Sequence, residues 1–177
     1  MTFAVRLAVE ADLPDIEALM ALAIDTLQAG FLTPAQIVAS RAVMGLDTQL
    51  VVDRSYFLVE AAGVLAGCGG WSRRATLYGG DHSASLRDPK PLDPAHDAAR
   101  IRAMYTHPAF ARRGIGRLVL ATCEQAAAQA GFMRAELMAT LSGVPLYEAC
   151  GYRSIEAAAA AVDGVAVPLV RMGKVLG

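Results

Sequence analysis

The stretch from Ile101 to Val119 constrains the fold of this chain more than any other part of the sequence. It begins as a short apolar segment, passes through a turn with two arginines and two glycines, and continues in a helical pattern. After Gly114, small or apolar residues recur every three or four positions, as on one buried face of a helix. The stretch therefore predicts a strand, a glycine-containing turn and an amphipathic helix in direct succession.

The turn Arg112–Arg117 has the properties of an anion-binding site. The first N–H groups of a helix lack intrahelical partners and carry roughly half a positive charge from the helix dipole. Glycine lets a ligand approach the backbone closely, and arginine adds formal charge. We therefore expect a phosphate or pyrophosphate to bind here. The alternative, a helix start with incidental arginines, predicts no ligand.

Other phosphate-binding loops fit this turn poorly. A dinucleotide-binding fingerprint needs a third glycine three residues after Gly116, where this chain has Val119, and a P-loop needs Gly-Lys followed by Ser or Thr. What remains, Arg-Arg-Gly-Ile-Gly between a strand and a helix, resembles the coenzyme A site of the GCN5-related N-acetyltransferase (GNAT) family. The family's first motif position, usually Gln or Arg, falls on Ala111, so one side-chain contact is lost.

A second segment, Pro145–Tyr152, resembles the short Leu-Tyr-X-X-X-Gly-Phe/Tyr signature of the same family. Two motifs in the right order and spacing are far more specific than either alone. The resemblance implies one GNAT domain over residues 1–177. Its expected fold is α/β, with a central mixed, mostly antiparallel sheet of about seven strands flanked by about four helices.

The other elements follow from hydrophobic periodicity and turn residues. Strands are expected at Phe3–Val9, Tyr56–Glu60, Val64–Trp71, Met133–Ala139, Tyr152–Ala161 and Val165–Lys174, and helices from Asp12 to Gly30, from Thr33 to about Met44, and from about Ser142 to Gly151. The final hairpin rests on the Asp163–Gly164 turn signal, which we weigh above the helical propensity of its alanines.

Two regions leave alternatives open. The glycines at 67, 69 and 70 indicate either a bulge or an acceptor that lies against their strand. The segment Ser72–Asp97 is long and irregular, so we regard it as a candidate lid over the reacting groups.

Composition excludes several classes of protein. The chain is 55% apolar, which excludes disorder, and its net charge of −1 does not favour nucleic-acid binding. It has no apolar run of about 18 residues and no N-terminal secretion signal, so we expect a cytoplasmic protein without membrane contact. Cys68, Cys123 and Cys150 suit reduced thiols, and together with the three histidines they give no metal-ligand spacing, so we expect no metal.

The resemblance also implies roles for particular residues. Tyr147 matches the family tyrosine that protonates the departing sulfur of coenzyme A, and a phenol with a pKa of about 10 is protonated at neutral pH. The alternative is that Tyr147 only packs. Acetyl-CoA is expected as co-substrate, with its pantetheine arm and thioester along one strand and its pyrophosphate at the turn. The expected contacts are made by Met104, Tyr105, Thr106, Arg112, Arg113, Gly114, Ile115, Gly116 and Arg117.

The general base is not assigned by either motif. Some family members carry a glutamate where this chain has about Arg100, which cannot accept a proton. Other candidates are a water chain and four side chains, each of which also suits an ordinary surface position: Glu60, Asp81, His82 and Glu136. Arg100 and Arg102 are alternatively candidates to bind an anionic group of the acceptor.

We therefore predict an acetyl-CoA-dependent N-acetyltransferase that acetylates a primary amine of a small molecule or peptide in a ternary complex, with Tyr147 as general acid. A catalytically weak coenzyme A sensor or partner-binding module of the same fold is the alternative. A homodimer through the final hairpin also stays open, because many relatives are dimers.

Overall fold

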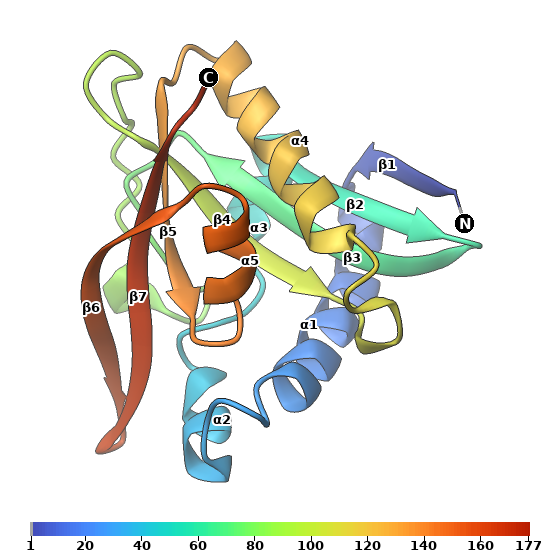
Figure 1. Cartoon of the computed structure of the whole chain (residues 1–177), viewed down its shortest axis with the longest axis vertical. Coiled ribbons are helices and arrows are strands. Elements are labelled where there is room, and N and C mark those ends of the chain that lie inside the picture. The colour runs from blue at the N-terminus through green and yellow to red at the C-terminus, as the bar shows by residue number, and fades with distance from the viewer. Residues whose placement is uncertain (1) are drawn as a thin grey trace.

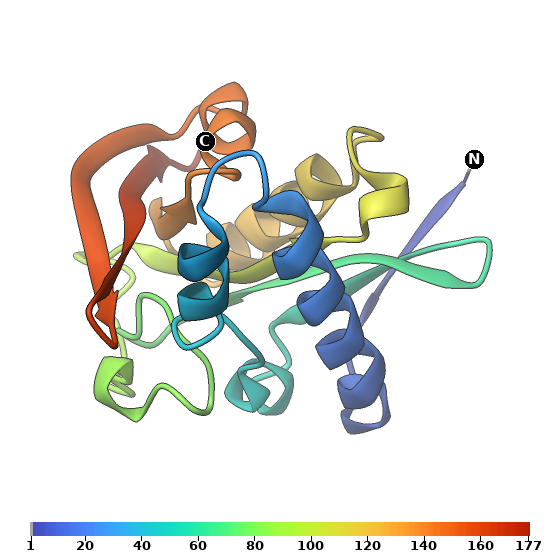
Figure 2. The same ribbon diagram turned by 90° about the horizontal axis from the view of Figure 1, so that it is seen from below.

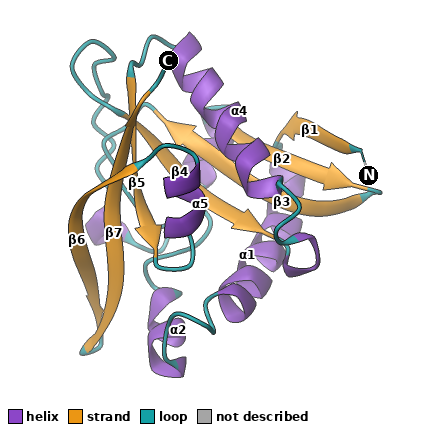
Figure 3. Ribbon diagram, in the orientation of Figure 1, coloured by secondary structure: helices purple, strands orange, loops and turns teal. Residues whose placement is uncertain are grey.

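A twisted sheet of seven strands forms the centre of the molecule, with helices on both of its faces (Figures 1 and 3). The computed structural model describes residues 2–177. The strands are β1 (Phe3–Leu7), β2 (Tyr56–Ala61), β3 (Val64–Ser72), β4 (Ala99–Thr106), β5 (Arg134–Thr140), β6 (Arg153–Val162) and β7 (Val165–Val175), in the sheet order β1-β2-β3-β4-β5-β7-β6. All neighbouring strands are antiparallel except β4 and β5, so the predicted mixed α/β fold is confirmed.

The described residues form five α-helices, one more than expected. They are α1 (Leu13–Leu27), α2 (Pro34–Ser40), α3 (Thr48–Val52), α4 (Ile115–Gln129) and α5 (Val144–Ala149). The prediction that the second helix continues to Met44 was wrong: after Ser40 the chain tightens into turns with i to i−3 hydrogen bonds. Helix α3 was missed because it has only five residues, two of them valines with low helix propensity.

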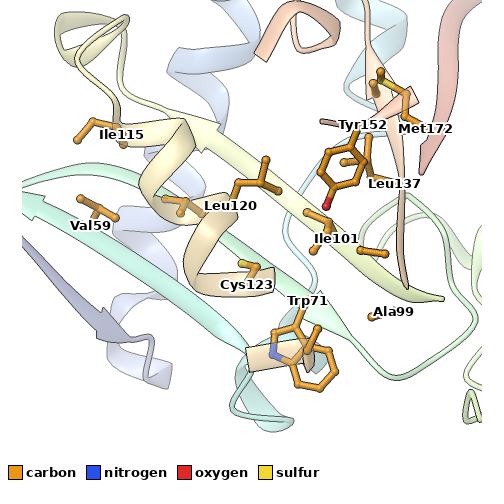
Figure 4. Close-up of a cluster of buried hydrophobic side chains, with 14 of the residues drawn as sticks. Val59, Trp71, Ala99, Ile101, Ile115, Leu120, Cys123, Leu137, Tyr152 and Met172 are labelled. Carbon is orange, nitrogen blue, oxygen red and sulfur yellow. The ribbon is translucent and has the colours of Figure 1, made fainter. Parts of the chain in front are cut away.

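The sheet buries a different cluster on each face, because alternate residues of a strand point in opposite directions. On one face, Val59 of β2 and Ile101 of β4 pack with Leu120 and Cys123 of α4 (Figure 4). On the other, Leu58 of β2 packs with residues of α1 and α3. Figure 2 shows α1 and α4 on opposite sides of the sheet.

Strand β4 contains a bulge that changes which side chains share a face. Cys68 of β3 pairs with Tyr105, and Gly70 pairs with Arg102, so one residue of β3 opposes two of β4. The extra residue, Ala103, has a left-handed φ of 50°. As a result Arg102 and Tyr105, three positions apart, both point away from α4.

Close packing of α4 on β3 explains two of the strand's glycines. A Cβ atom on Gly67 would clash with Ile115, and one on Gly69 would lie 2.6 Å from Val119 Cγ1. Gly69 also lies at the register shift opposite the bulge. Of the two alternatives for these glycines, the structure supports the bulge and adds the approach of α4.

The predicted hairpin turn at Asp163–Gly164 is confirmed, and so is the strand assignment of the alanine run. Asp163 and Gly164 both have positive φ, 49° and 79°, as a two-residue type I′ turn requires. Helix α2 packs against this hairpin, and Gln36 Nε2 donates a hydrogen bond to the Ala166 carbonyl at 3.0 Å. The N-terminal helices therefore reach across to the C-terminal strands.

Candidate functional site

The cleft between β4 and β5 is the centre of the candidate site. These parallel strands pair only at Ala99–Ala135 and Arg100–Glu136, and then diverge (Figure 1). A narrow cavity of about 80 Å³ lies where they separate. It is lined by residues 101–105 of β4, by Leu137, Met138 and Thr140 of β5, by Tyr147 and Leu169, and by two connecting segments, Val43–Gly45 and Leu77–Gly79.

The turn before α4 is built by two left-handed residues, Arg112 with a φ of 62° and Gly114 with a φ of 87°. Gly114 is the N-cap and gives no side-chain cap, and the first intrahelical bond runs from the Leu118 N–H to the Gly114 carbonyl at 2.9 Å. The N–H groups before Leu118 are therefore without intrahelical partners. The exposed side chains of Arg112, Arg113 and Arg117 surround them, so the turn has the chemistry of an anion site.

Helix α5 brings Tyr147 beside this turn. Leu146 lies against Gly116, where an added Cβ would be 2.8 Å from Leu146 Cδ2. The Tyr147 ring lines the cavity and meets the ring of Tyr152 edge to face, with 5.9 Å between centroids. Burial raises the pKa of the Tyr147 phenol, and no hydrogen bond within residues 2–177 offsets this effect. The phenol is therefore protonated at neutral pH and free to donate.

The structure gathers the predicted site residues into two adjoining groups. Met104, Tyr105 and Tyr147 line the cavity, whereas residues 112–117 form the turn next to it. Thr106 joins the groups, because its hydroxyl lies 3.7 Å from the Cβ position of Gly116. The Ile115 side chain, by contrast, is buried against β3, so only its backbone can face a ligand in the turn.

Two segments close the other side of the cavity, Val43–Gly45, which sequence reasoning missed, and Leu77–Gly79. We call them the acceptor wall, because this is the side of the cavity on which an acceptor is proposed to bind. The second belongs to the segment that was expected to form a lid, and it lines the cavity. Both contact β4, because the Tyr105 hydroxyl accepts a hydrogen bond from the Gly45 N–H at 3.1 Å and Arg102 donates one to the Gly79 carbonyl at 2.6 Å. The sequence signal for this contact was the charge of Arg102 among apolar residues of β4.

The four side chains considered as general bases all lie outside the cavity lining, and their polar atoms are engaged elsewhere. Glu60 pairs with Arg6, and Asp81 pairs with Arg87. His82 Nε2 lies 2.8 Å from the Arg41 carbonyl.

The fourth candidate, Glu136, accepts hydrogen bonds from both Arg100 and Arg171. Arg102 pairs with Asp47 at 3.0 Å. Arg100 and Arg102 are thus both engaged by carboxylates of the protein itself, which disfavours their proposed role in binding an anionic group of the acceptor.

Other sequence expectations concern cysteines, metals and membranes. Cys68 and Cys123 are buried and Cys150 is half-buried, all as free thiols. Over residues 2–177, no three His, Cys, Asp or Glu side chains lie close enough together to hold a metal ion. No helix in that range is both long and apolar enough to cross a membrane.

Comparison with known proteins gives the class of this fold and site. The profile of the Acetyltransferase (GNAT) family matches residues 17–152. The chain therefore belongs to the GNAT acetyltransferase family, whose members use acetyl-CoA as co-substrate. No curated protein matches the sequence.

Solved structures share the fold at low sequence identity. A GCN5-related N-acetyltransferase of Rhodopseudomonas palustris superposes with a TM-score of 0.71 and 16% identity, covering 99% of this chain and 97% of that one. The PaiA N-acetyltransferase of Thermoplasma acidophilum, solved with coenzyme A, gives 0.63 and 15%, with 99% of each chain covered. YncA of Salmonella typhimurium, solved with acetyl-CoA, gives 0.64 and 17%, covering 100% and 95%.

Proposed function

We propose that this protein transfers the acetyl group of acetyl-CoA to a primary amine of a small molecule or peptide by direct attack in a ternary complex. The observation that carries the proposal is the position of the Tyr147 phenol. It lines the same cavity as the diverging part of β4, one residue from the contact between α5 and Gly116. A proton donor therefore lies between the anion-binding turn and the acceptor wall.

The turn before α4 is the proposed site of the pyrophosphate. Its unpaired N–H groups and the exposed arginines at 112, 113 and 117 supply hydrogen bonds and positive charge. From there the pantetheine arm is proposed to follow residues 104–106 of β4, which have no strand partner on the β5 side. The thioester would then lie in the cavity beside Tyr147.

Acetyl transfer requires two proton transfers, one to the leaving thiolate and one from the attacking nitrogen. The amine attacks the thioester carbonyl, whose oxygen gains negative charge. A backbone N–H near Met104, which lines the cavity, is proposed to stabilise this charge. The C–S bond then breaks, and the Tyr147 hydroxyl donates its proton to the leaving thiolate. The nitrogen must also lose a proton, and solvent in the cleft is the proposed acceptor, because the carboxylates near it are ion-paired.

The engaged carboxylates also favour a second candidate, a coenzyme A-binding module with little catalysis. One assay separates the two functions. The purified protein is mixed with acetyl-CoA and a panel of primary amines, free thiol release is followed, and acetylated amine is identified by mass spectrometry. Acetyl transfer supports the enzyme. Calorimetric binding of coenzyme A without thiol release supports the module, and the absence of binding heat contradicts both.

A further inference from the structure

Arg102 carries a charge into the wall of the cavity. Although it is charged, this side chain on the central strand β4 is only 3% exposed. The guanidinium donates to Asp47 Oδ2 at 3.0 Å, to the Gly79 carbonyl at 2.6 Å and to the Thr76 carbonyl at 3.3 Å. One buried side chain thus joins β4 to two regions that are distant in the sequence, Asp47 and the segment from Thr76 to Gly79.

Asp47 extends this contact to a small network. It is the N-cap of α3 and accepts the Gln49 N–H at 3.1 Å, so its position fixes the start of that helix. Arg87 donates to both Asp47 and Asp81, at 3.2 and 3.0 Å. Charged groups therefore tie the irregular segment after β3 to α3 and, through Arg102, to β4.

The network ends at the acceptor wall. Arg102 bonds directly to Gly79, and Asp47 lies two residues after Gly45, which is itself held by the Tyr105 hydroxyl. Both β4 side chains reach the wall only because the bulge at Ala103 turns them to the same face. Three of the wall residues that line the cavity are apolar: Val43, Met44 and Leu77.

We propose that the buried Arg102–Asp47 pair is a positioning pair that holds this apolar acceptor wall, and so sets the affinity for the acceptor without setting the affinity for acetyl-CoA. The proposal rests on the proposed function. The pair does not touch the turn at 112–117, so its loss reshapes one side of the cavity only. A small displacement of a substrate-positioning group is enough to change rates about 100-fold.

The test compares Arg102→Lys with a matched control at a second ion pair. Lysine keeps the charge but cannot reach three acceptors with a planar fork. Arg74 and Asp53 form a bidentate pair at 2.8 Å that joins the same irregular segment to the other end of α3, away from the cavity, so Arg74→Lys is the control. Asp47→Asn, which retains a capping side chain, is the second variant if Arg102→Lys does not fold.

Two measurements are made on each folded variant. Hydrogen exchange is expected to speed up at least about tenfold in residues 43–47 and 76–81 of the Arg102 variant, but not of the control, while residues 112–117 stay unchanged. With benzylamine as the probe acceptor, its KM is expected to rise at least about tenfold and that of acetyl-CoA to stay within about twofold. Unchanged exchange, or equal shifts in both KM values, overturns the proposal.

The outcome distinguishes failure of this proposal from failure of the proposed function. If the wild-type protein binds coenzyme A but acetylates neither benzylamine nor any other amine, the proposed function fails. The exchange comparison then decides the positioning role alone: faster exchange in both wall segments supports it, and unchanged exchange overturns it.

Discussion

The turn at 112–117 and the acceptor wall lie on either side of one cleft, but different forces shape them. The turn takes its form from two left-handed residues within six positions and from the helix that follows. The wall depends on side chains far away in the sequence, such as Arg102, which is 55 residues from Asp47. The difference teaches that the proposed cofactor side of this site is local in sequence, whereas the proposed acceptor side is a product of tertiary structure.

The largest effect is expected where the two sides meet. Tyr147→Phe removes the hydroxyl that is proposed to donate the proton and keeps the ring that packs on Tyr152. We expect kcat to fall by ~10²–10⁴ while calorimetry shows unchanged affinity for coenzyme A. Wild-type turnover in this variant would reject the role of Tyr147 as general acid and leave it a packing residue.

The next largest effect concerns the close packing of α4 on β3. A methyl group on Gly67 would clash with Ile115 and lie 3.2 Å from the Tyr105 carbonyl. We expect Gly67→Ala to lower the free energy of unfolding by about 1–3 kcal/mol in urea titrations, because α4 must move off the sheet. Gly30→Ala is the control, since an added Cβ there has nothing within 4 Å. Equal stability of the two variants would contradict the close packing of α4.

A smaller effect isolates the backbone of the turn. Gly114 has a φ of 87° and open space around it, so Gly114→Ala adds backbone strain of about 1 kcal/mol and no clash. Gly164→Ala adds the same kind of strain, at a φ of 79°, in the distant hairpin. Both variants should lose similar stability, but only Gly114→Ala should weaken coenzyme A binding in calorimetry. If the two variants bound coenzyme A with equal affinity, the proposal that the pyrophosphate binds at this turn would be wrong.

The smallest effect concerns the ion pair of Arg74 and Asp53, which lies away from the cavity. Arg74 holds the pKa of Asp53 below its ordinary value of about 4. The unfolded chain then binds a proton more readily than the folded one, so this stabilisation is present above about pH 4 and is lost as pH falls. We expect Asp53→Asn to flatten the decrease in the urea midpoint between pH 5 and about pH 3. An unchanged slope would show that the pair adds nothing to stability.

Local patterns predicted most of the fold. Apolar periodicity located the seven strands, and the Asp163–Gly164 turn correctly outweighed the helical propensity of the alanine run, because both residues adopt positive φ. The short helix α3 was missed, since five residues give too few turns for a periodic pattern. The two motifs likewise located the turn and Tyr147. The helix that carries Tyr147 meets the turn where Leu146 packs against Gly116.

The acceptor wall was beyond such reasoning. Its contacts join Arg102 to Asp47 and Gly79, and no spacing in the sequence indicates which carboxylate or carbonyl a buried arginine will meet. The same limit applies to Glu136, which looks like a free base in the sequence but lies between two arginines in the fold.

The extra residue in β4 has a consequence for how this chain tolerates change in length. Removing Ala103 would restore an unbroken two-residue alternation and leave Arg102 and Tyr105 two positions apart, on the face that they already share. Both side chains could then still reach the same two segments of the wall. The strand can therefore lose one residue at this point without turning either side chain over, whereas a one-residue deletion in a regular part of a strand would do so.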